Sequence, residues 1–335
     1  MDAFVRVVGL RKYFPVQKGA LQRLVSRARD YVRAVDDVSF TIEKGRVMTL
    51  AGESGSGKTT TGKTILRLVE PTEGHVFLGG TDVTTMKREA LRRFRRRMQM
   101  VFQDPYASLD PRQRIGDAVS DPLRIHGISN ASERRQLGLQ MLEKVGLTPP
   151  SDFFDLYPRN MSGGQRQRVA IARAIILHPD LVVADEPVSM IDVSLRSSIL
   201  ELMIKLKEEF DLTYLFITHD LAVAKEISDT IAIMYMGEIV EIASREELYT
   251  KPLHPYTICL LSAVPVPDPD NVSQGLIAKG EISSAINPPP GCRFSPRCPF
   301  AQPLCTAKHP DLQKIREGHS VACFFPKETY SIIRS

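Results

Sequence analysis

The sequence predicts an α/β protein in which a mostly parallel sheet is covered by helices on both faces. Residues 181–184 and 215–218 are short, continuous apolar runs of the kind found in strands that are buried on both sides. Helix-like stretches at 165–177, 192–210 and 220–227 alternate with these runs. A glycine-rich loop at 52–59 also joins an apolar run to a helix-like stretch. Strands that alternate with helices favour a parallel sheet.

Composition places the chain among ordinary globular proteins. It has 335 residues, of which 43% are hydrophobic and 25% charged, and a formal net charge of +5. At roughly 150 residues per domain, this length suggests two domains. The small positive charge does not by itself indicate nucleic-acid binding. No apolar run reaches the ~18 residues of a membrane-spanning helix, and Arg6 interrupts the N-terminal run, so we expect neither a spanning helix nor a secretory signal.

Local patterns divide the rest of the chain. Residues 38–51 are predicted to form two strands broken at Lys44-Gly45, and residues 59–69 a helix. Residues 104–164 contain no strand-like run, and 132–145 are helix-like, so this stretch is predicted to be a helical insertion. From about residue 250 prolines become frequent, and four of the five cysteines fall between 292 and 323. A small appended module, held by something other than a large apolar core, is expected there.

Two stretches are strongly basic. Residues 87–97 carry seven cations against one acid, and residues 20–33 place four arginines around an apolar stripe. Each is interpreted either as a solvated face or as a surface that contacts anionic lipid headgroups.

Residues 52–59, Gly-Glu-Ser-Gly-Ser-Gly-Lys-Thr, fit the P-loop pattern G-x-x-x-x-G-K-[ST]. The glycines let consecutive backbone N–H groups point into one concavity, and the helix that follows adds its positive dipole end. Lys58 is predicted to reach the β- and γ-phosphates of ATP, and Thr59 to bind Mg²⁺. The residues predicted to surround the phosphates are Gly52, Glu53, Ser54, Gly55, Ser56, Gly57, Lys58, Thr59 and Thr60.

A P-loop site also needs an acidic residue at the end of a second strand. The run 181–184 ends at Asp185 and Glu186. Asp185 is predicted to hold Mg²⁺ through water, and the carboxylate of Glu186 to polarise the attacking water as a general base.

Further motifs, in order along the chain, make it resemble the ATP-binding cassette (ABC) ATPases. Residues 161–165, Met-Ser-Gly-Gly-Gln, resemble the signature loop of that family, usually written Leu-Ser-Gly-Gly-Gln. Gln103 resembles the Q-loop glutamine, and Asp192 ends a segment similar to the D-loop. His219 resembles the switch histidine. Together these motifs cover roughly residues 3 to 250. Met161, Met190, Ile191 and Val188 depart from the usual residues but remove no carboxylate, lysine or histidine.

The resemblance implies roles for these residues. Two ATPase subunits would enclose two ATP molecules head to tail, so the signature loop would contact ATP bound by the partner; its residues are Ser162, Gly163, Gly164 and Gln165. Gln103 would bind Mg²⁺ and respond to the transport domain. His219 would hold the γ-phosphate and the water in line. An aromatic ring would stack on adenine; Phe14 is the first candidate and Tyr13 the second, with ordinary core packing as the alternative for either.

A narrower resemblance is to the oligopeptide/dipeptide/nickel group of ABC importer ATPases. It is carried by residues 103–111, Gln-Asp-Pro-Tyr-Ala-Ser-Leu-Asp-Pro, and by 254–257, His-Pro-Tyr-Thr. The spacing of Cys292, Cys298, Cys305 and Cys323 is similar to that of the group's C-terminal cysteine cluster, which holds a [4Fe–4S] cluster. From the residues alone, four clustered thiols in a reducing cell indicate metal, with zinc or buried thiols as alternatives. Cys259 lies outside the set and is expected to be a core thiol.

The sequence therefore predicts a P-loop NTPase core with an N-terminal antiparallel β subdomain, a helical subdomain at about 104–164 and a small, irregular, Cys-rich C-terminal extension. The expected domains are 1–255 for nucleotide binding and 256–335 for the extension. The resemblance implies an ATPase at the cytoplasmic face of the membrane that energises peptide uptake. Its implied partners are two permease subunits, a second ATPase subunit (a paralogue rather than an identical chain), and indirectly an extracellular solute-binding protein.

Three alternatives stay open at this stage. The same ATPase role could serve nickel or oligosaccharide uptake. A soluble ABC ATPase that acts on nucleic acid or ribosomes is disfavoured because the chain has one P-loop, and such proteins usually carry two cassettes. An iron–sulfur sensor that uses ATP only structurally is disfavoured because Glu186 and His219 are both present.

Overall fold

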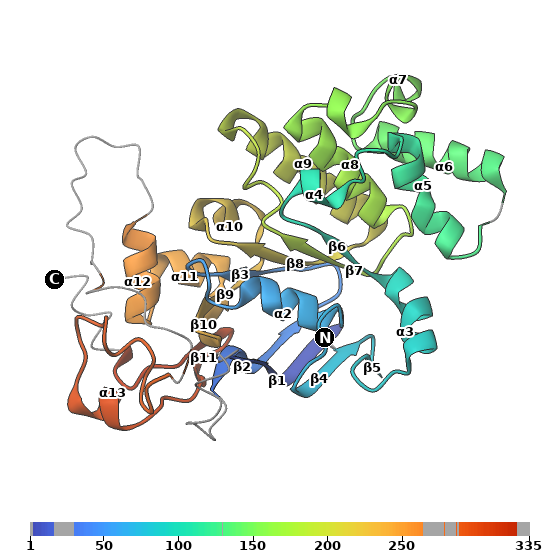
Figure 1. Ribbon diagram of the computed structural model, residues 1–335. Coiled ribbons are helices and arrows are strands. Elements are labelled where there is room, and N and C mark those ends of the chain that lie inside the picture. Colours follow the sequence, from blue (N-terminus) through green and yellow to red (C-terminus); the bar gives the residue numbers. More distant parts are fainter. Residues whose placement is uncertain are drawn as a thin grey trace, which may run out of the picture. The chain divides into compact units, whose positions relative to one another are not determined.

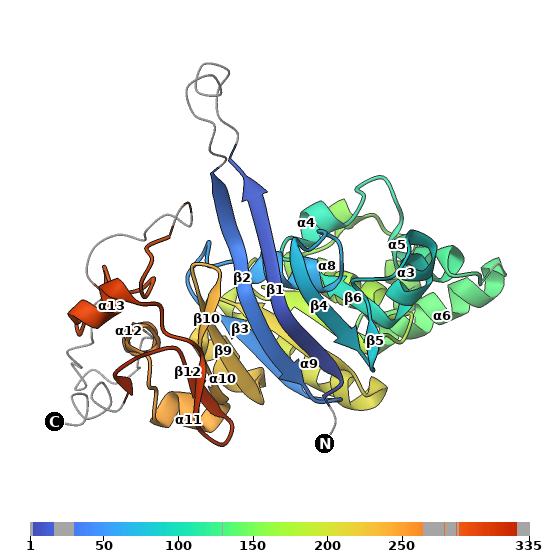
Figure 2. The same ribbon diagram turned by 90° about the horizontal axis from the view of Figure 1, so that it is seen from below.

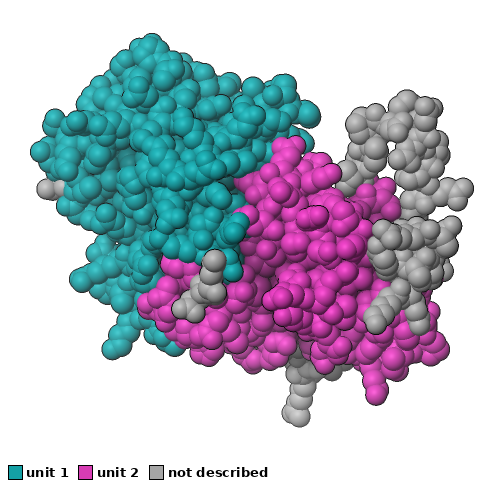
Figure 3. Space-filling view, turned by 180° about the vertical axis from the view of Figure 1, so that it is seen from behind, with its two compact units in different colours: residues 1–2, 42–47, 85–217 teal, residues 3–41, 48–84, 218–335 magenta. Residues whose placement is uncertain are grey.

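The computed structural model describes residues 3–16, 30–128, 130–263, 278, 286 and 288–326 (Figure 1). The chain divides into two compact units (Figure 3). Unit 1 contains residues 42–47 and 85–217, and unit 2 contains 3–41, 48–84 and 218–335. The predicted boundary between residues 255 and 256 is not a boundary between these units, and the division into two domains there stays a prediction.

A parallel sheet forms the centre of unit 1. Strand β6 (Met98–Val101) pairs with β7 (Leu181–Asp185), and β7 pairs with β8 (Thr213–Thr218). All residues of β7 and β8 are buried, as the continuous apolar runs predict. Helices α8 (Gly163–Ile175) and α9 (Val193–Phe210) connect these strands, close to the predicted ranges 165–177 and 192–210. The basic stretch 87–97 forms the short helices α3 (Arg88–Phe94) and η1 (Arg95–Arg97).

Between β6 and α8 the described backbone is helical and contains no strand. It forms α4 (Pro105–Ser108), α5 (Ile115–Ile125), α6 (Ala131–Lys144), α7 (Pro150–Phe154) and η2 (Pro158–Asn160). The Asn130 side chain caps α6 by accepting hydrogen bonds from Ser132 N and Glu133 N, at 2.9 and 3.4 Å. This cap explains why α6 begins where the sequence pattern predicts a helix.

Unit 2 contains an antiparallel sheet in the order β2-β1-β4-β5. The strands are β1 (Val5–Pro15), β2 (Tyr31–Ile42), β4 (Glu73–Leu78) and β5 (Thr81–Asp82). Figure 2 shows β1 and β2 as two long strands side by side. Alternate residues of β2 are buried over its second half, so one face of the strand packs on a core. Most of the basic stretch 20–33 lies outside the described residues.

A second group of strands in unit 2 runs in the order β11-β12-β10-β9-β3. Strand β3 (Val47–Ala51) is parallel to β9 (Thr230–Tyr235), and β10 (Glu238–Ser244) is antiparallel to β9. The C-terminal part of the chain adds β11 (Gln313–Arg316), β12 (His319–Val321) and helix α13 (Pro303–Ala307). The remaining helices of this unit are α2 (Lys58–Ile65), α10 (Leu221–Ile227), α11 (Arg245–Thr250) and α12 (Pro255–Ser262).

A buried polar contact joins the C-terminal strands to the rest of unit 2. Glu241 and His319 are both fully buried, and a His319 Nε2 to Glu241 Oε1 distance of 2.7 Å links β12 to β10. The Glu241 carboxylate also accepts hydrogen bonds from Leu253 N and His254 N, at 2.7 and 3.0 Å. These partners offset the cost of burying the carboxylate. The chain from 292 to 323 is therefore anchored by specific contacts.

Among the described residues, no helix combines the length and the hydrophobicity that crossing a bilayer would require.

Candidate functional site

Three glycines shape the loop at residues 52–57, because each has a positive φ angle that glycine adopts more readily than other residues. Gly52, Gly55 and Gly57 have φ angles of 147°, 81° and 107°. A Cβ atom at Gly52 would lie 2.2 Å from Met234 O, and one at Gly57 would lie 2.1 Å from Ala34 O. Gly52 and Gly57 are thus also required by close packing against β9 and β2. Helix α2 begins at Lys58, directly after the loop.

Lys58 lies against the loop that it follows. Its Nζ donates to Gly52 O at 2.7 Å, to Glu53 O at 2.9 Å and to Ser56 Oγ at 3.4 Å, and only 5% of the residue is exposed. Ser54 and Gly55 are exposed, whereas Ser56 is buried. A buried ammonium group, loop amides and a helix N-terminus together form a setting suited to phosphate.

Two residues outside the ATP-binding motifs hold Glu53. Glu53 N donates to the Tyr256 hydroxyl at 2.8 Å, and the Glu53 carboxylate accepts from Arg297 Nη1 and Nη2 at 2.8 and 3.1 Å. The hydrogen bond from Arg297 to Glu53 raises the pKa of the guanidinium, which stays charged. Sequence reasoning missed both partners. The one available signal was the 254–257 motif, which contains Tyr256.

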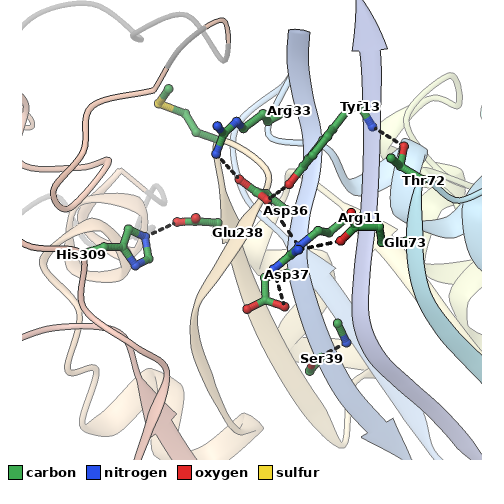
Figure 4. Close-up of polar contacts among 12 residues, drawn as sticks. Arg11, Tyr13, Arg33, Asp36, Asp37, Ser39, Thr72, Glu73, Glu238 and His309 are labelled. Atoms are coloured by element: carbon green, nitrogen blue, oxygen red, sulfur yellow. Dashed lines mark hydrogen bonds and ion pairs between the residues drawn. The ribbon is translucent and has the colours of Figure 1, made fainter.

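The two candidate aromatic residues of β1 have different surroundings. The Tyr13 hydroxyl donates to Asp36 Oδ1, a contact seen in Figure 4. Burial, followed by this hydrogen bond, raises the pKa of Tyr13 to about 12. Asp36 is also paired with Arg293, which donates to Met236 O as well. Phe14, in contrast, is 37% exposed, and Lys12 Nζ lies 4.9 Å from its ring centroid. Phe14 is therefore the more accessible ring.

In unit 1 the structure brings Gln103 and Glu186 together. Asp185 ends β7 and is 2% exposed. Glu186 follows with a left-handed φ of 45°, and its N–H donates to Ile217 O at 2.9 Å. Gln103 Nε2 donates to Glu186 Oε2 at 2.8 Å. This contact orients a carboxylate at the end of a buried strand, where a general base would be needed.

The loop at 161–165 forms the start of α8. Ser162 is the N-cap, its Oγ accepts from Gln165 N at 3.3 Å, and Gln165 Oε1 accepts from Ser162 N at 2.9 Å. This reciprocal capping box fixes the loop and orients Ser162 and Gln165. Asp192 is the N-cap of α9, and its side chain makes no capping hydrogen bond.

Several large exposed residues lie close to this loop or to Asp192. A Cβ atom at Gly163 would lie 3.7 Å from the Tyr106 hydroxyl and 3.8 Å from the Met190 carbonyl oxygen, and one at Gly164 would lie 3.2 Å from Leu195 Cδ1. Tyr106 and Met190 are each 56% exposed, and Val193 is 75% exposed. The Arg166 guanidinium lies 4.0 Å from the Tyr106 ring centroid. Apolar surface of this kind is typical of an interaction site.

His219 belongs to unit 2, where it is exposed directly after β8. Asp220 follows it and caps α10 by accepting from Ala222 N and Val223 N, at 2.8 and 3.4 Å. The backbone on either side of His219 is thus fixed by a strand end and a helix cap.

The four C-terminal cysteines line one cavity. Cys292, Cys298, Cys305 and Cys323 surround it together with Phe294, Phe300, Phe324 and Phe325. Cys292 N donates to Cys305 O at 2.7 Å. Among the described residues, however, no group of three or more His, Cys, Asp or Glu side chains is arranged to hold a metal ion. Cys259 packs against the apolar core formed by Tyr235, Tyr256 and Phe294, as expected of a core thiol, and burial raises its pKa to about 11.

Two family models match separate parts of the chain. The model described as "ABC transporter" matches residues 35–189, which include the P-loop, Gln103, the signature loop, Asp185 and Glu186. The model described as "Oligopeptide/dipeptide transporter, C-terminal region" matches residues 240–305, which include three of the four clustered cysteines.

Two curated proteins of similar length and one solved structure also resemble this chain. The oligopeptide transport ATP-binding protein AppF of Bacillus subtilis is 45% identical over 96% of this chain and 97% of its own length. The dipeptide transport ATP-binding protein DppF of Haemophilus influenzae is 44% identical over 96% of each chain. The structure of a dimeric ATP-binding cassette in a post-hydrolysis state, bound to ADP and Pi, has a TM-score of 0.63 and 30% identity, covering 72% of this chain and 98% of that one.

Proposed function

Because this chain belongs to the ABC transporter family of ATPases, we propose that it is the ATP-hydrolysing subunit of an importer of oligopeptides or dipeptides. The main support for peptides as the substrate class is the match of residues 240–305 to the C-terminal region of oligopeptide/dipeptide transporters. The high identity to an oligopeptide and a dipeptide transport protein over nearly the whole chain supports the same conclusion.

The proposed mechanism is positioning and charge neutralisation. The loop amides of 52–57 and the Lys58 ammonium would stabilise the charge that develops on the transferring phosphoryl group. Thr59, Gln103 and Asp185 would hold Mg²⁺, which neutralises phosphate charge when bound. Glu186 would accept a proton from the attacking water or orient it, and its contact with Gln103 supports that role. His219 would keep the water and the γ-phosphate in line, and Phe14, or otherwise Tyr13, would stack on adenine.

We propose that the signature loop acts on ATP held by a second ATPase subunit. Ser162, Gly163, Gly164 and Gln165 would contact its γ-phosphate, and Asp192 would face the partner through the D-loop. The exposed side chains of Met190 and Val193, which flank Asp192, support a macromolecular contact at this surface. A paralogue is proposed as the partner in preference to an identical chain.

The membrane context follows from the same proposal. Two permease subunits would bind the helical subdomain at about 104–164, and the ATPase would lie peripherally at the cytoplasmic face. An extracellular solute-binding protein would supply the peptide. Nickel or an oligosaccharide are the alternative solutes.

We also propose that Cys292, Cys298, Cys305 and Cys323 hold a [4Fe–4S] cluster. The fit rests on four thiols that line one cavity among phenylalanine rings. A cluster of four irons is larger than a single ion, so its thiolates stand farther apart than the ligands of one zinc ion, whose Zn–S distance is about 2.3 Å. A four-thiol cavity without a mononuclear site is therefore compatible with a cluster. When bound, the cluster would cross-link the segment from 292 to 323.

Metal content tests this assignment independently of ATP hydrolysis. Anaerobically purified full-length protein is expected to contain about four irons and four acid-labile sulfides per chain, and to be brown. Replacing any one of the four cysteines with Ser should bleach it, whereas Cys259→Ser should not. Stoichiometric zinc without iron would contradict the cluster.

Hydrolysis by the assembled transporter tests the main function. The chain, co-expressed with its membrane subunits, should co-purify with them and hydrolyse ATP faster when the loaded peptide-binding protein is added. Co-purification only with ribosomes or nucleic acid would contradict the proposal.

A further inference from the structure

The P-loop carries an acidic residue whose charge is paired from the C-terminal segment. The Glu53 carboxylate accepts two hydrogen bonds from one guanidinium, at 2.8 Å from Arg297 Nη1 and 3.1 Å from Nη2. The side chains are 27% exposed for Glu53 and 9% exposed for Arg297, so solvent screens the pair only partly. Bidentate, charge-assisted pairs of this kind are strong and directional.

The position of Arg297 is fixed by the cysteine segment, which we define as residues 292–323. Consecutive turns link Ser295 N to Cys292 O at 3.0 Å and Arg297 N to Phe294 O at 2.9 Å. Arg297 directly precedes Cys298. Its guanidinium lies 5.9 Å from the ring centroid of Tyr235 and 6.0 Å from that of Phe294. The backbone turns and the two rings therefore fix the position of the Arg297 guanidinium beside Glu53.

Glu53 is in turn connected to the phosphate-binding groups of the loop. Its N–H is held by the Tyr256 hydroxyl at 2.8 Å, and its carbonyl oxygen accepts from Lys58 Nζ at 2.9 Å. The rings of Tyr256 and Phe294 pack with centroids 5.3 Å apart. A change in the orientation of Glu53 would thus shift a loop amide and the lysine that the loop holds.

We propose that Arg297 is a positioning residue for ATP binding, and that the cysteine segment, through Arg297 and Glu53, is part of the support of the P-loop. This inference rests on the proposed role of residues 52–59 in binding phosphate. Arg297 does two things: it fixes the side chain of Glu53, and it neutralises a carboxylate beside a loop that receives the negatively charged phosphates of ATP. An unpaired Glu53 would repel those phosphates.

A double-mutant cycle separates the two residues. The measurement is calorimetric binding of MgATP to the purified full-length subunit. Arg297→Ala leaves Glu53 unpaired and is expected to weaken binding about tenfold. Glu53→Gln removes the repelling charge together with the pair, so we expect a smaller loss of about threefold. Adding Arg297→Ala to Glu53→Gln should then change the affinity by less than about twofold, because the partner of Arg297 is already gone.

Arg316→Ala is the matched control. Arg316 also lies in the cysteine segment and also pairs with a glutamate of unit 2, since its Nε is 3.0 Å from Glu247 Oε2. This pair does not include a P-loop residue, so ATP affinity should stay within about twofold of that of the unchanged protein. Arg297→Lys keeps the charge but not the bidentate geometry, and should bind ATP with intermediate affinity.

Kinetics of the assembled transporter give a second measurement. Arg297→Ala should raise KM for ATP about tenfold while kcat at saturating ATP stays within about threefold, because no group that contacts the reacting atoms is changed. Two results would overturn the inference. One is an MgATP affinity of Arg297→Ala equal to that of the unchanged protein. The other is a loss of affinity on Arg297→Ala that is as large in the Glu53→Gln background as in the unchanged protein. If Arg297→Ala does not fold, Arg297→Lys and Glu53→Gln test the same pair. Failure of the unchanged protein to bind ATP would instead contradict the proposed function.

Discussion

Glu186 is the residue on which the proposed chemistry depends most. It follows a fully buried strand, takes a left-handed backbone conformation and accepts a hydrogen bond from Gln103. Glu186→Gln keeps the shape of the side chain and removes its basicity. We expect ATP turnover by the assembled transporter to fall by about 10²–10⁴, the usual size of the loss of a general base, while ATP binding persists.

The matched control for this substitution is Glu201→Gln, which changes an exposed glutamate of α9 in the same unit. Turnover in that variant should equal that of the unchanged protein. Steady-state phosphate release at saturating ATP measures both variants. Turnover of Glu186→Gln near that of the unchanged protein would remove Glu186 from the mechanism.

His309 makes one contact of the cysteine segment sensitive to pH. Its Nε2 lies 2.8 Å from Glu238 Oε2 on β10 (Figure 4), and this hydrogen bond raises the pKa of His309. Because the folded pKa is above the unfolded one, the stabilisation is complete below the unfolded pKa of about 6.5 and is lost as pH rises through the folded value. The side chain is 40% exposed, so the contribution should be at most ~1 kcal/mol.

The melting temperature should therefore fall more between pH 6 and pH 9 in the unchanged protein than in His309→Gln, which does not titrate. The difference between the two curves isolates His309 from other titrating groups. Parallel curves would show that the contact adds no stability.

At the residue scale, the sequence predicted residues that belong to local motifs and missed those that act across long separations. Glu53 was predicted within its motif, but Tyr256 lies 203 positions away and Arg297 lies 244 positions away. Neither residue type nor spacing indicates such a pairing, because it depends on how the C-terminal segment folds onto unit 2. The phosphate-facing role of each residue in 52–60 remains a prediction.

At the element scale, the agreement between predicted helices and the structure is good where a local signal marks the start of the helix. The helix predicted at 132–145 is α6 (Ala131–Lys144), which Asn130 caps. The helix predicted at 59–69 is shorter, since α2 ends at Ile65 and Arg67 adopts a left-handed φ of 48°. Strands β11 and β12 were not predicted, because β11 is almost entirely exposed and has no apolar alternation. They form by pairing with each other and with β10.

Helices α5 and α6 both place a glycine against the Phe154 ring of α7. A Cβ atom at Gly116 of α5 would lie 2.1 Å from the Phe154 ring, so Gly116→Ala must displace that ring. The expected cost is about 1–3 kcal/mol of unfolding free energy, as is usual for overpacked cores.

The control is Gly138→Ala in α6, where the added Cβ would lie 3.0 Å from the same ring. The higher helix propensity of alanine, worth up to ~1 kcal/mol, offsets part of the cost at both positions, so the smaller overlap decides the order. Gly138→Ala should therefore cost less than Gly116→Ala in denaturant unfolding. The reverse order would contradict the packing described here.

At the scale of the whole molecule, the C-terminal segment and the P-loop belong to the same compact unit. The sequence predicts a small appended module there, because its composition changes near residue 250, and that division stays a prediction. The contacts that tie it to the rest of unit 2 are a salt bridge to Asp36, one to Glu53 and the pairing of β12 with β10. All three join residues far apart in sequence, so composition could not reveal them.

Helix α4, at the start of the proposed permease-binding region 104–164, gives a prediction about assembly. A photo-crosslinking amino acid in place of Tyr106, which is 56% exposed, should capture a membrane subunit in the intact transporter. The control position is Val8, a 42% exposed residue of β1, which should capture neither membrane subunit. Mass spectrometry of the crosslinked bands identifies the partner. Capture of ribosomal protein alone from position 106 would contradict the importer proposal.

If ATP hydrolysis by this chain drives peptide uptake, the coupling should be measurable as transport in a reconstituted system. The complete transporter, placed in vesicles with the peptide-binding protein on the uptake side and MgATP on the other, should accumulate labelled peptide. Uptake should cease with Glu186→Gln and persist with Glu201→Gln. Excess nickel or oligosaccharide should not compete with the peptide. ATP hydrolysis without peptide accumulation, or peptide uptake that persists in Glu186→Gln, would contradict the account.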